Sequence, residues 1–426
     1  MGMIKTIAHA WKIAEIRKKI IFTLLMLVVF RLGSNIPVPG MDRAVLADVF
    51  SGDTGLFGLF DLFSGGAFSN FTIFALSITP YITASIILQL LTIAVPSLER
   101  LAKEGEEGKK KIAQLTRYLT VILAFVQAIG LSVGLFRQAL ISTDLFSIIV
   151  IVLTLSAGTA FLMWLGEQIN ENGIGNGISL IIFAGIVSRI PSGIHTTWIK
   201  FQAGEVGLIT IIVFILFAMI VIVGIIEIQQ GQRRIPVQYA KRVVGRKMYG
   251  GQSTHIPLKV NQAGVIPVIF SLSLLQFPLT ITYFVPDSGL ATWVAKWLSP
   301  SGDPGVWIYA MFNILLIMFF TYFYTAVTFN PADVANNMKA NGGFIPGIRP
   351  GRSTVDYLTK VLTRVTFVGA VFLAVVATLP TLIDQFTNLD LGFGGTSLLI
   401  AVGVALDTMK QLENQMVMRN YQGFLK

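Results

Sequence analysis

Residues 55–91 read GLFGLFDLFSGGAFSNFTIFALSITPYITASIILQLL and contain two apolar segments of different length. The second, about 71–95, is long enough at about 1.5 Å per residue to cross a hydrocarbon core of about 30 Å. The first, 56–63, is too short to cross and too apolar for an exposed loop, and a Ser-Gly-Gly break at 64–66 follows it. Irregular backbone at membrane depth is tolerated only inside protein or along a cavity. The stretch therefore predicts a short plug hinged to a membrane-spanning helix.

The composition is typical of a polytopic membrane protein. Of the 426 residues, 54% are hydrophobic and 13% are charged, which excludes a water-soluble domain. Cysteine is absent, so disulfides, thiolate nucleophiles and Cys-based metal sites are excluded. His9, His195 and His255 lie far apart, and none has a second ligand at metal-binding spacing. We therefore expect no metal and no other cofactor.

Apolar runs predict an all-α fold with ten transmembrane helices. The first span begins near residue 20 and ends at the turn at 37–40. The other runs are 71–95, 118–136, 145–165, 178–190, 208–228, 263–285, 306–329, 361–383 and 396–412. Most of the 32 Lys and Arg residues fall on one side of these spans, which places both termini in the cytoplasm.

The segments outside the spans divide the chain into parts. Residues 1–19 have the pattern of a basic amphipathic helix on the membrane surface, and 413–426 form a cytoplasmic tail. An external linker at 191–207 separates a first half, 20–190, from a second half, 208–412.

Two cytoplasmic loops, 231–261 and 330–360, are each about thirty residues long and rich in Arg, Lys, Gly and Pro. Their charge alone follows the positive-inside rule, but their length favours docking surfaces for a cytoplasmic partner, either an acidic protein or RNA.

The two halves contain matching strings. GISLII at 177–182 matches GTSLLI at 395–400, and PYI at 80–82 matches PVI at 267–269. Both matches recur after five spans. A repeat with an odd number of spans enters the membrane from opposite sides, so the pattern predicts two pseudo-symmetric inverted five-helix halves.

Spans two, five, seven and ten are interrupted by Gly or Pro, and such helices mark the centre of an inverted-repeat protein. Six isoleucines on these spans could meet at mid-membrane: Ile78, Ile82, Ile178, Ile182, Ile269 and Ile400. The alternative is that they face lipid or pack against ordinary neighbours.

Ionisable residues within the spans are scarce. Glu167, Glu227, Arg31 and Asp407 lie towards span ends, and the sequence contains no His-Glu-x-x-His, Gly-x-Ser-x-Gly or Walker motif. We expect no enzymatic activity, but a gated pore for a cargo that the protein does not bind chemically. A small-solute secondary transporter with inverted repeats and an insertase that only releases helices into lipid are the alternatives.

Unusual strings in order along the whole chain, among them FRLGSNIPVPG at 30–40, LMWLGEQINENGIGNGISLIIFAGIV at 162–187, QGQRRIPVQYAKR at 230–242 and FNPADVANNMKANGGFIPGIRPG at 329–351, closely resemble the SecY family. Its members are channel subunits of the bacterial Sec translocon. The resemblance implies an hourglass pore whose waist is closed by the six isoleucines. It also implies a plug helix at about 56–70 on the outer side, with Leu56, Phe57, Leu59, Phe60, Asp61, Leu62, Phe63, Ser64, Gly65 and Gly66.

The resemblance further implies a lateral gate, where spans two and three part from seven and eight to release signal sequences and transmembrane segments into the lipid bilayer. Thr83 and Phe277 would face each other there. Gln89 at this seam could tune the gate or make an ordinary interhelical hydrogen bond.

The implied partners are the SecA motor ATPase or a translating ribosome on the basic loops, the membrane subunits SecE and SecG, and the translocating polypeptide. Arg349 is the residue expected to matter most for docking, with Arg352, Arg233, Arg234, Lys241 and Arg242. The implied location is the bacterial plasma membrane, in an obligate complex with SecE.

Overall fold

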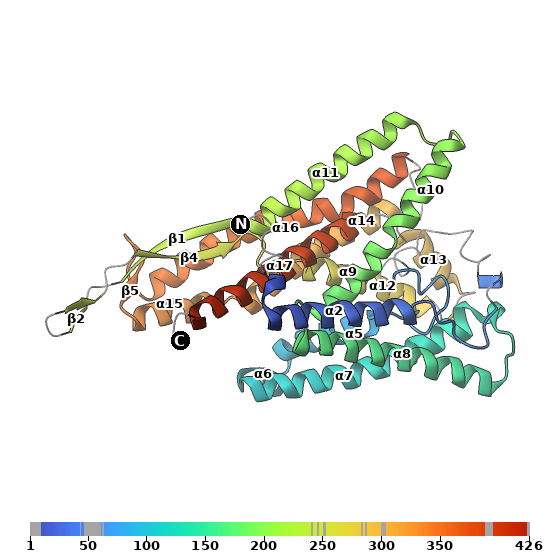
Figure 1. Cartoon of the computed structure of the whole chain (residues 1–426), viewed down its shortest axis with the longest axis horizontal. Coiled ribbons are helices and arrows are strands. Elements are labelled where there is room, and N and C mark those ends of the chain that lie inside the picture. Colours follow the sequence, from blue (N-terminus) through green and yellow to red (C-terminus); the bar gives the residue numbers. More distant parts are fainter. Residues whose placement is uncertain are drawn as a thin grey trace.

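The computed structural model describes residues 10–42, 44–46, 61, 64–239, 242–244, 247–249, 253–282, 284–285, 288–299, 304–387 and 395–423. In this part of the chain, long helices form a bundle, and a small antiparallel sheet projects from one end of it (Figure 1). The expectation of an all-α fold is therefore wrong for the cytoplasmic loops, although the fold is mostly helical.

In the described part of the first half, the named elements are all helices. They are α2 (Ala14–Gly33), α5 (Thr79–Ala94), α6 (Pro96–Lys103), α7 (Glu106–Ile129), the π-helical η1 (Gly130–Leu135), the short η2 (Arg137–Ala139), α8 (Leu145–Asn172), α9 (Gly177–Ser188) and α10 (Ile190–Gln202). Helix α10 covers most of the expected external linker at 191–207, which is thus largely helical. A single residue, Arg189, separates α10 from α9.

The second half contains both helices and strands. Its elements are α11 (Leu208–Gln230), β1 (Gln232–Tyr239), β2 (Arg242–Val244), β3 (Lys247–Tyr249), β4 (Ser253–Lys259), α12 (Ile266–Thr282), α13 (Gly289–Trp297), α14 (Gly305–Thr328), α15 (Pro331–Ala340), β5 (Gly343–Phe344), α16 (Arg352–Thr387) and α17 (Gly395–Gly423). The expected C-terminal tail, 413–426, continues helix α17 as far as Gly423.

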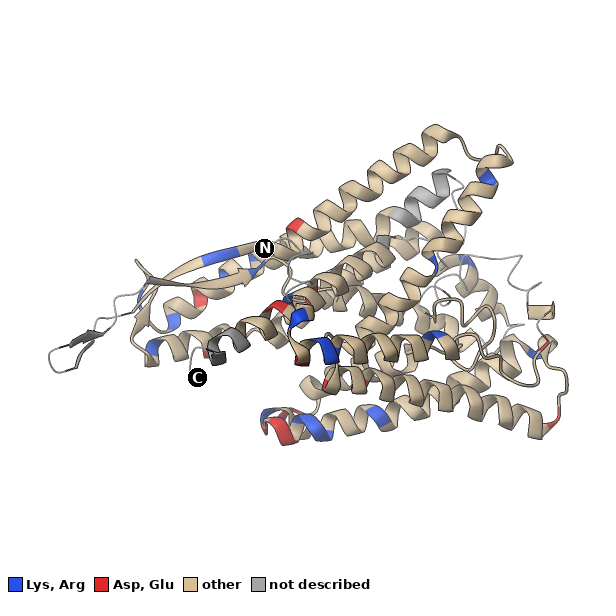
Figure 2. Cartoon of the chain, viewed as in Figure 1, with Lys and Arg blue, Asp and Glu red and all other residues tan. Residues whose placement is uncertain are grey.

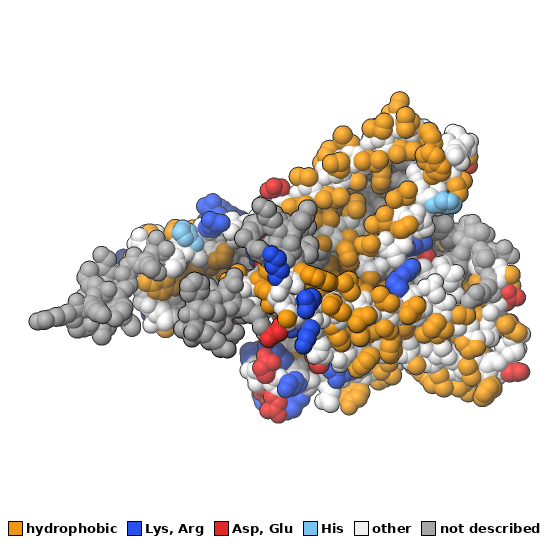
Figure 3. All heavy atoms as spheres, viewed as in Figure 1, with side chains coloured by type: hydrophobic (Ala, Val, Ile, Leu, Met, Phe, Trp, Pro, Cys, Tyr) orange, Lys and Arg blue, Asp and Glu red, His pale blue; other side chains and the backbone are white. Residues whose placement is uncertain are grey.

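The bundle has the surface of a membrane protein. By length and composition, six helices of the described chain could cross a bilayer, and a seventh does if the bent pair α5 and α6 counts as one span. Among these candidate spans of the described chain, α11 has the highest mean hydropathy, 3.4, and only 6% of its most apolar window is buried inside the protein. Apolar side chains cover the body of the bundle in Figure 3. Six or seven spans support a multi-pass protein, and the count of ten stays a prediction.

Helix α5 begins later than the apolar run at 71–95 predicts, at Thr79. Phe71 and Ser77 have positive φ angles of 43° and 52°, which a helix cannot accommodate. The Ile73 amide donates to the Ile36 carbonyl at 3.0 Å, and the Ile73 carbonyl oxygen lies against Gly158 of α8. Tertiary contacts with Ile36, after α2, and with α8 therefore hold residues 71–78 in a series of turns instead of a helix.

Gly158 allows this close approach, because a Cβ at that position would overlap the Ile73 carbonyl oxygen. We expect Gly158→Val to lower the free energy of unfolding by about 1–3 kcal/mol, as overpacking of a core typically does. Thermal unfolding of the purified protein in detergent would measure the change. Gly289→Val is the matched control, since nothing lies within 4 Å of a Cβ at Gly289. Equal stability of the two variants would contradict the tight contact.

The two long basic loops form one small platform. Strand β1 pairs with β4 from Gln232↔Lys259 to Gln238↔Ser253, and with β5 on its other edge through Gln238↔Phe344. Alternate residues Ile235 and Val237 of β1 point into a separate hydrophobic core. Buried members of that core are Ile235, Val237, Leu258, Ala335, Met338, Ile345, Leu358 and Leu362. The platform, defined as β1, β4, β5, α15 and the start of α16, thus joins both loops.

The N-terminal segment is partly buried in protein, although the sequence predicts a helix on the membrane surface. Ala10 and Ile16 are 0% and 2% exposed and pack with Ile174 and Leu412. Residues 1–9 lie outside the described part. The start of α2 is therefore attached to the loop before α9 and to α17.

Candidate functional site: the central apolar cluster and the segment that covers it

All six candidate isoleucines belong to one hydrophobic cluster at the centre of the bundle. Ile78, Ile82, Ile182, Ile269 and Ile400 are buried, and the partly buried Ile178 packs against them. They come from four elements: the start of α5, α9, α12 and α17. The structure thus brings together residues that are more than 300 positions apart in the sequence.

Local sequence fixes where α9 presents its isoleucines. The Asn176 side chain caps the helix by accepting from the Ser179 amide at 3.2 Å, and Gly177 allows the backbones of α9 and α8 to touch. A Cβ on Gly166 of α8 would lie 2.5 Å from Ile178 Cδ1. Ile178 therefore leans against α8, whereas Ile182, one turn later, is 1% exposed within the cluster.

The candidate plug is described only in part: residues 56–60, 62 and 63 lie outside the described chain. These contain the predicted plug residues Leu56, Phe57, Leu59, Phe60, Leu62 and Phe63. Asp61 and the segment from Ser64 to Asn70 are described, and Ala67 of this segment is 0% exposed in the same cluster as the isoleucines. The last part of the predicted plug, from Ser64 to Asn70, therefore packs into the central cluster through Ala67.

Polar contacts hold this segment in place. The Arg189 guanidinium donates to the Asp61 carboxylate, with Nη2 and Oδ2 2.9 Å apart, and the Ser69 amide donates to Oδ1 at 2.9 Å. Arg31, in the last turn of α2, donates to the Gly65 carbonyl at 3.0 Å. The segment is thus attached to the ends of α2 and α9.

The Ser-Gly-Gly break forms a packed turn in the structure, and its role as a hinge stays a prediction. Gly65 and Gly66 have φ angles of 65° and 90°, which favour glycine. A Cβ on Gly65 would lie 2.8 Å from the Gly185 Cα of α9. Gly65 is therefore needed for close backbone contact with α9, whereas Gly66 is favoured by its backbone angle alone.

The expected gate residues lie on α5 and α12, which pack side by side. Thr83 donates to the Thr79 carbonyl at 3.1 Å within α5, and Gln89 contacts Ser85 at 3.5 Å on the same helix. Phe277 is 48% exposed. The described interactions of Thr83 and Gln89 are therefore local ones.

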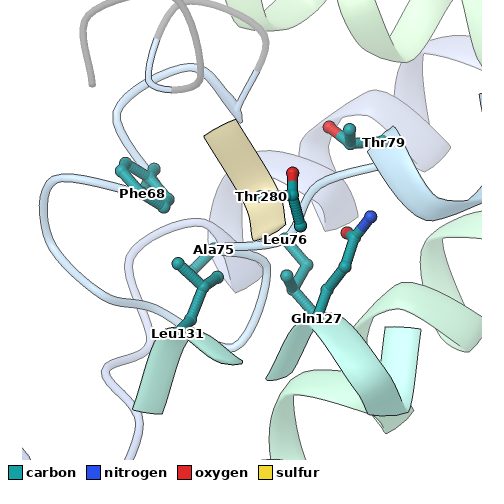
Figure 4. A pocket seen from close by; sticks show the side chains of 7 residues that line it. All are labelled: Phe68, Ala75, Leu76, Thr79, Gln127, Leu131 and Thr280. Carbon is teal, nitrogen blue, oxygen red and sulfur yellow. The ribbon is translucent and has the colours of Figure 1, made fainter. Parts of the chain in front are cut away.

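A small pocket marks the seam where α5, α7 and α12 meet (Figure 4). It is lined by Phe68, Ala75, Leu76, Thr79, Gln127, Leu131 and Thr280. Sequence reasoning missed Gln127 and Thr280. A polar residue inside an apolar run was the available signal for each, but the run did not show which residues face the seam.

The expected docking arginines lie on the platform. Arg233 and Arg234 are exposed on β1, Arg349 is exposed after β5, and Arg352 is the exposed first residue of α16. Figure 2 shows basic residues on this projecting part. Lys241 lies outside the described residues, and only the backbone of Arg242, in β2, is described.

Charges on α6 and α7 differ from these arginines because they are paired locally. Lys103–Glu99, Lys109–Glu106 and Lys111–Glu107 are 2.6, 3.2 and 3.9 Å apart. The hydrogen bond from Lys103 lowers the pKa of Glu99. Among the ion pairs of the described residues, none involves the four platform arginines. Arg233, Arg349 and Arg352 are therefore available to a partner, whereas Arg234 donates to the Gln232 side chain beside it on β1.

Taken together, apolar helices around an apolar centre, with a packed covering segment and a basic platform, define a multi-pass membrane protein of the channel type. Comparisons with known proteins agree. The SecY family model matches residues 72–409. The chain is 53% identical to "Protein translocase subunit SecY" of Halalkalibacterium halodurans and 48% identical to that of Bacillus subtilis, each over 100% of both chains.

Solved structures share the fold. One described as "The structure of a protein conducting channel" has a TM-score of 0.67 at 22% identity and covers 94% of this chain and 93% of its own. Another, of Sec61 in a canine ribosome-channel complex, has a TM-score of 0.60 at 20% identity and covers 94% and 93%. The chain belongs to the SecY family. This membership supports a non-enzymatic channel subunit and gives no support to a small-solute transporter.

Proposed function

We propose that this chain is the protein-conducting channel of a bacterial Sec translocon, and that unfolded secretory polypeptides cross the membrane through its central cluster. The observation that supports this most strongly is the convergence of Ile78, Ile82, Ile182, Ile269 and Ile400 in one cluster. An apolar constriction dewets and blocks ions, while flexible aliphatic side chains can close around any passing chain. A channel of this kind needs no binding site for its cargo.

The proposed architecture is an hourglass pore of two inverted five-helix halves. We assign the ten predicted spans to α2, α5, α7 with η1, α8 and α9 in the first half, and to α11, α12, α14, α16 and α17 in the second. In this assignment α6, α10, α13 and α15 lie outside the spans. The plug, about 56–70, covers the outer side of the constriction.

The proposed lateral gate is the seam between α5 and α7 on one side and α12 and α14 on the other. Its parting would give signal sequences and transmembrane segments access to lipid. Thr83, Gln89 and Phe277 remain the predicted gate residues, and Gln127 and Thr280 join them because they line the pocket at the seam (Figure 4).

The proposed partners dock on the platform from the cytoplasm, which places both termini on the cytoplasmic side of the plasma membrane. SecA or a translating ribosome would supply the energy, because no nucleotide motif occurs in the sequence. Two structural neighbours are described as ribosome-bound complexes, of canine Sec61 and yeast Ssh1, at TM-scores of 0.60 and 0.61. SecE and SecG complete the proposed complex.

Site-specific crosslinking tests this function. A photoreactive residue at Ile182, which is 1% exposed, should crosslink to many successive positions of a secretory chain stalled in proteoliposomes. The same residue at Ile220 on α11, which is 61% exposed, should crosslink to lipid or to a partner subunit instead. Crosslinks from position 182 to lipid or neighbouring helices alone would contradict passage through the cluster and reopen the insertase alternative.

A further inference from the structure

Asp61 is a buried carboxylate in the segment that covers the central cluster. Its side chain is 6% exposed, and that of its partner Arg189 is 31% exposed. A charged side chain is expensive to bury unless it is paired and hydrogen-bonded. The role of this pair is not explained by an apolar constriction, which needs no charges.

The Asp61 side chain organises the turn around it. Besides Arg189, its Oδ1 accepts from the Ser69 amide at 2.9 Å and from the Ser64 hydroxyl at 3.4 Å. Its backbone carbonyl accepts from the Gly66 amide at 3.1 Å. The carboxylate therefore ties Asp61 to the turn at 64–69, and its ion pair attaches that turn to α9.

The attachment points lie on the helices that border the cluster. Arg189 is the C-cap residue of α9, the helix that carries Ile182, and Arg31 holds the Gly65 carbonyl from the end of α2. Ala67, two residues after Gly65, is buried in the cluster that contains the isoleucines. When the Asp61 attachment is intact, Ala67 is thus held in the cluster.

We propose that the Asp61–Arg189 ion pair, supported by the Arg31 bond to Gly65, is a polar latch that sets how readily the channel opens and therefore which signal sequences open it. The inference rests on the proposed channel function. Apolar contacts have no direction and slide easily, whereas an ion pair with fixed hydrogen bonds holds one position of the segment. Displacing the segment exposes both charges to water, which stabilises them separately.

The proposed latch predicts that Arg189→Gln alone opens the channel more readily than either Asp61→Asn or the double variant. Arg189→Gln leaves the Asp61 carboxylate buried without its cation, which destabilises only the closed state. Asp61→Asn is milder, because the amide oxygen still accepts from Ser69 and Arg189 is partly exposed. The double variant should also be milder than Arg189→Gln alone, because it contains no unpaired buried charge.

Labelling of a single cysteine measures opening directly, since the natural chain has no cysteine. Ala67→Cys is placed in the closed complex in proteoliposomes and treated with a membrane-impermeant maleimide. Labelling should be slow in the otherwise unchanged chain and at least about tenfold faster with Arg189→Gln. The double variant Asp61→Asn/Arg189→Gln should return towards the unchanged rate. Arg137→Gln, at an exposed arginine, is the matched control and should change nothing.

Leakage of a small anion from the same vesicles gives a second measurement on chains without the cysteine, and it should follow the same order. Equal labelling and leakage for Arg189→Gln and unchanged protein, or an equal rise for Arg137→Gln, would overturn the latch. These measurements require no transport. Failure of the unchanged protein to translocate a secretory chain would instead contradict the proposed function.

Discussion

Replacing Ile400 with asparagine is expected to make the channel leak ions and to raise passage of secretory proteins with defective signal sequences at least about tenfold. Ile400 is 0% exposed in the central cluster and comes from α17, which packs against α9. An amide at this position brings hydrogen-bonding groups into an apolar constriction. Because unsatisfied buried amides are costly, a hydrated or open pore becomes more favourable than a dry, closed one.

Two further variants separate this effect from a general loss of packing. Ile400→Val keeps the site apolar and should remain sealed. Ile317→Asn puts the same amide at a residue that is also 0% exposed in the same cluster, but on α14, outside the proposed ring. Ion flux and translocation are measured with all three proteins at equal amounts in vesicles. Equal leakage from Ile317→Asn and Ile400→Asn would remove Ile400 from the ring.

The central cluster could be predicted from the sequence because two independent signals coincide there. Repeated strings around Ile182 and Ile400 gave the symmetry, and helical spacing placed Ile78 next to Ile82. In the structure these residues are buried in one hydrophobic cluster. Their role as a ring stays a prediction. Ile178 fits a ring least well, because its Cδ1 lies against Gly166 of α8.

Other features could not be predicted because distant contacts determine them. Asp61 and Arg189 are far apart in the sequence, and no local pattern indicates that they form an ion pair. The late start of α5 depends on the contact of Ile73 with Gly158. The sheet was missed because its strands lie in loops whose charge concealed the alternation of Ile235 and Val237.

The largest effect on transport driven from the cytoplasm is expected from Arg349→Glu, which should reduce SecA-driven translocation at least about tenfold. The Arg349 backbone is held in a turn, because its carbonyl accepts from the Thr354 hydroxyl at 2.9 Å and the preceding Ile348 amide donates to the Ile345 carbonyl at 3.0 Å. Its side chain is exposed. A cation on a fixed backbone loses little conformational entropy on binding an acidic partner, and reversal of its charge replaces attraction by repulsion.

Lys339→Glu is the matched control, since Lys339 is an exposed cation on α15 of the same platform. It makes the same change in net charge, so a purely electrostatic attraction of the motor to the platform would weaken equally in both variants. Specific docking on Arg349 predicts a large loss for Arg349→Glu alone. ATP-dependent translocation and SecA binding are measured in the same vesicles, and ion leakage checks that the channel stays closed. Normal transport by Arg349→Glu would remove this residue from the docking surface, and equal losses would mean that the platform attracts its partner through charge, without one dominant contact.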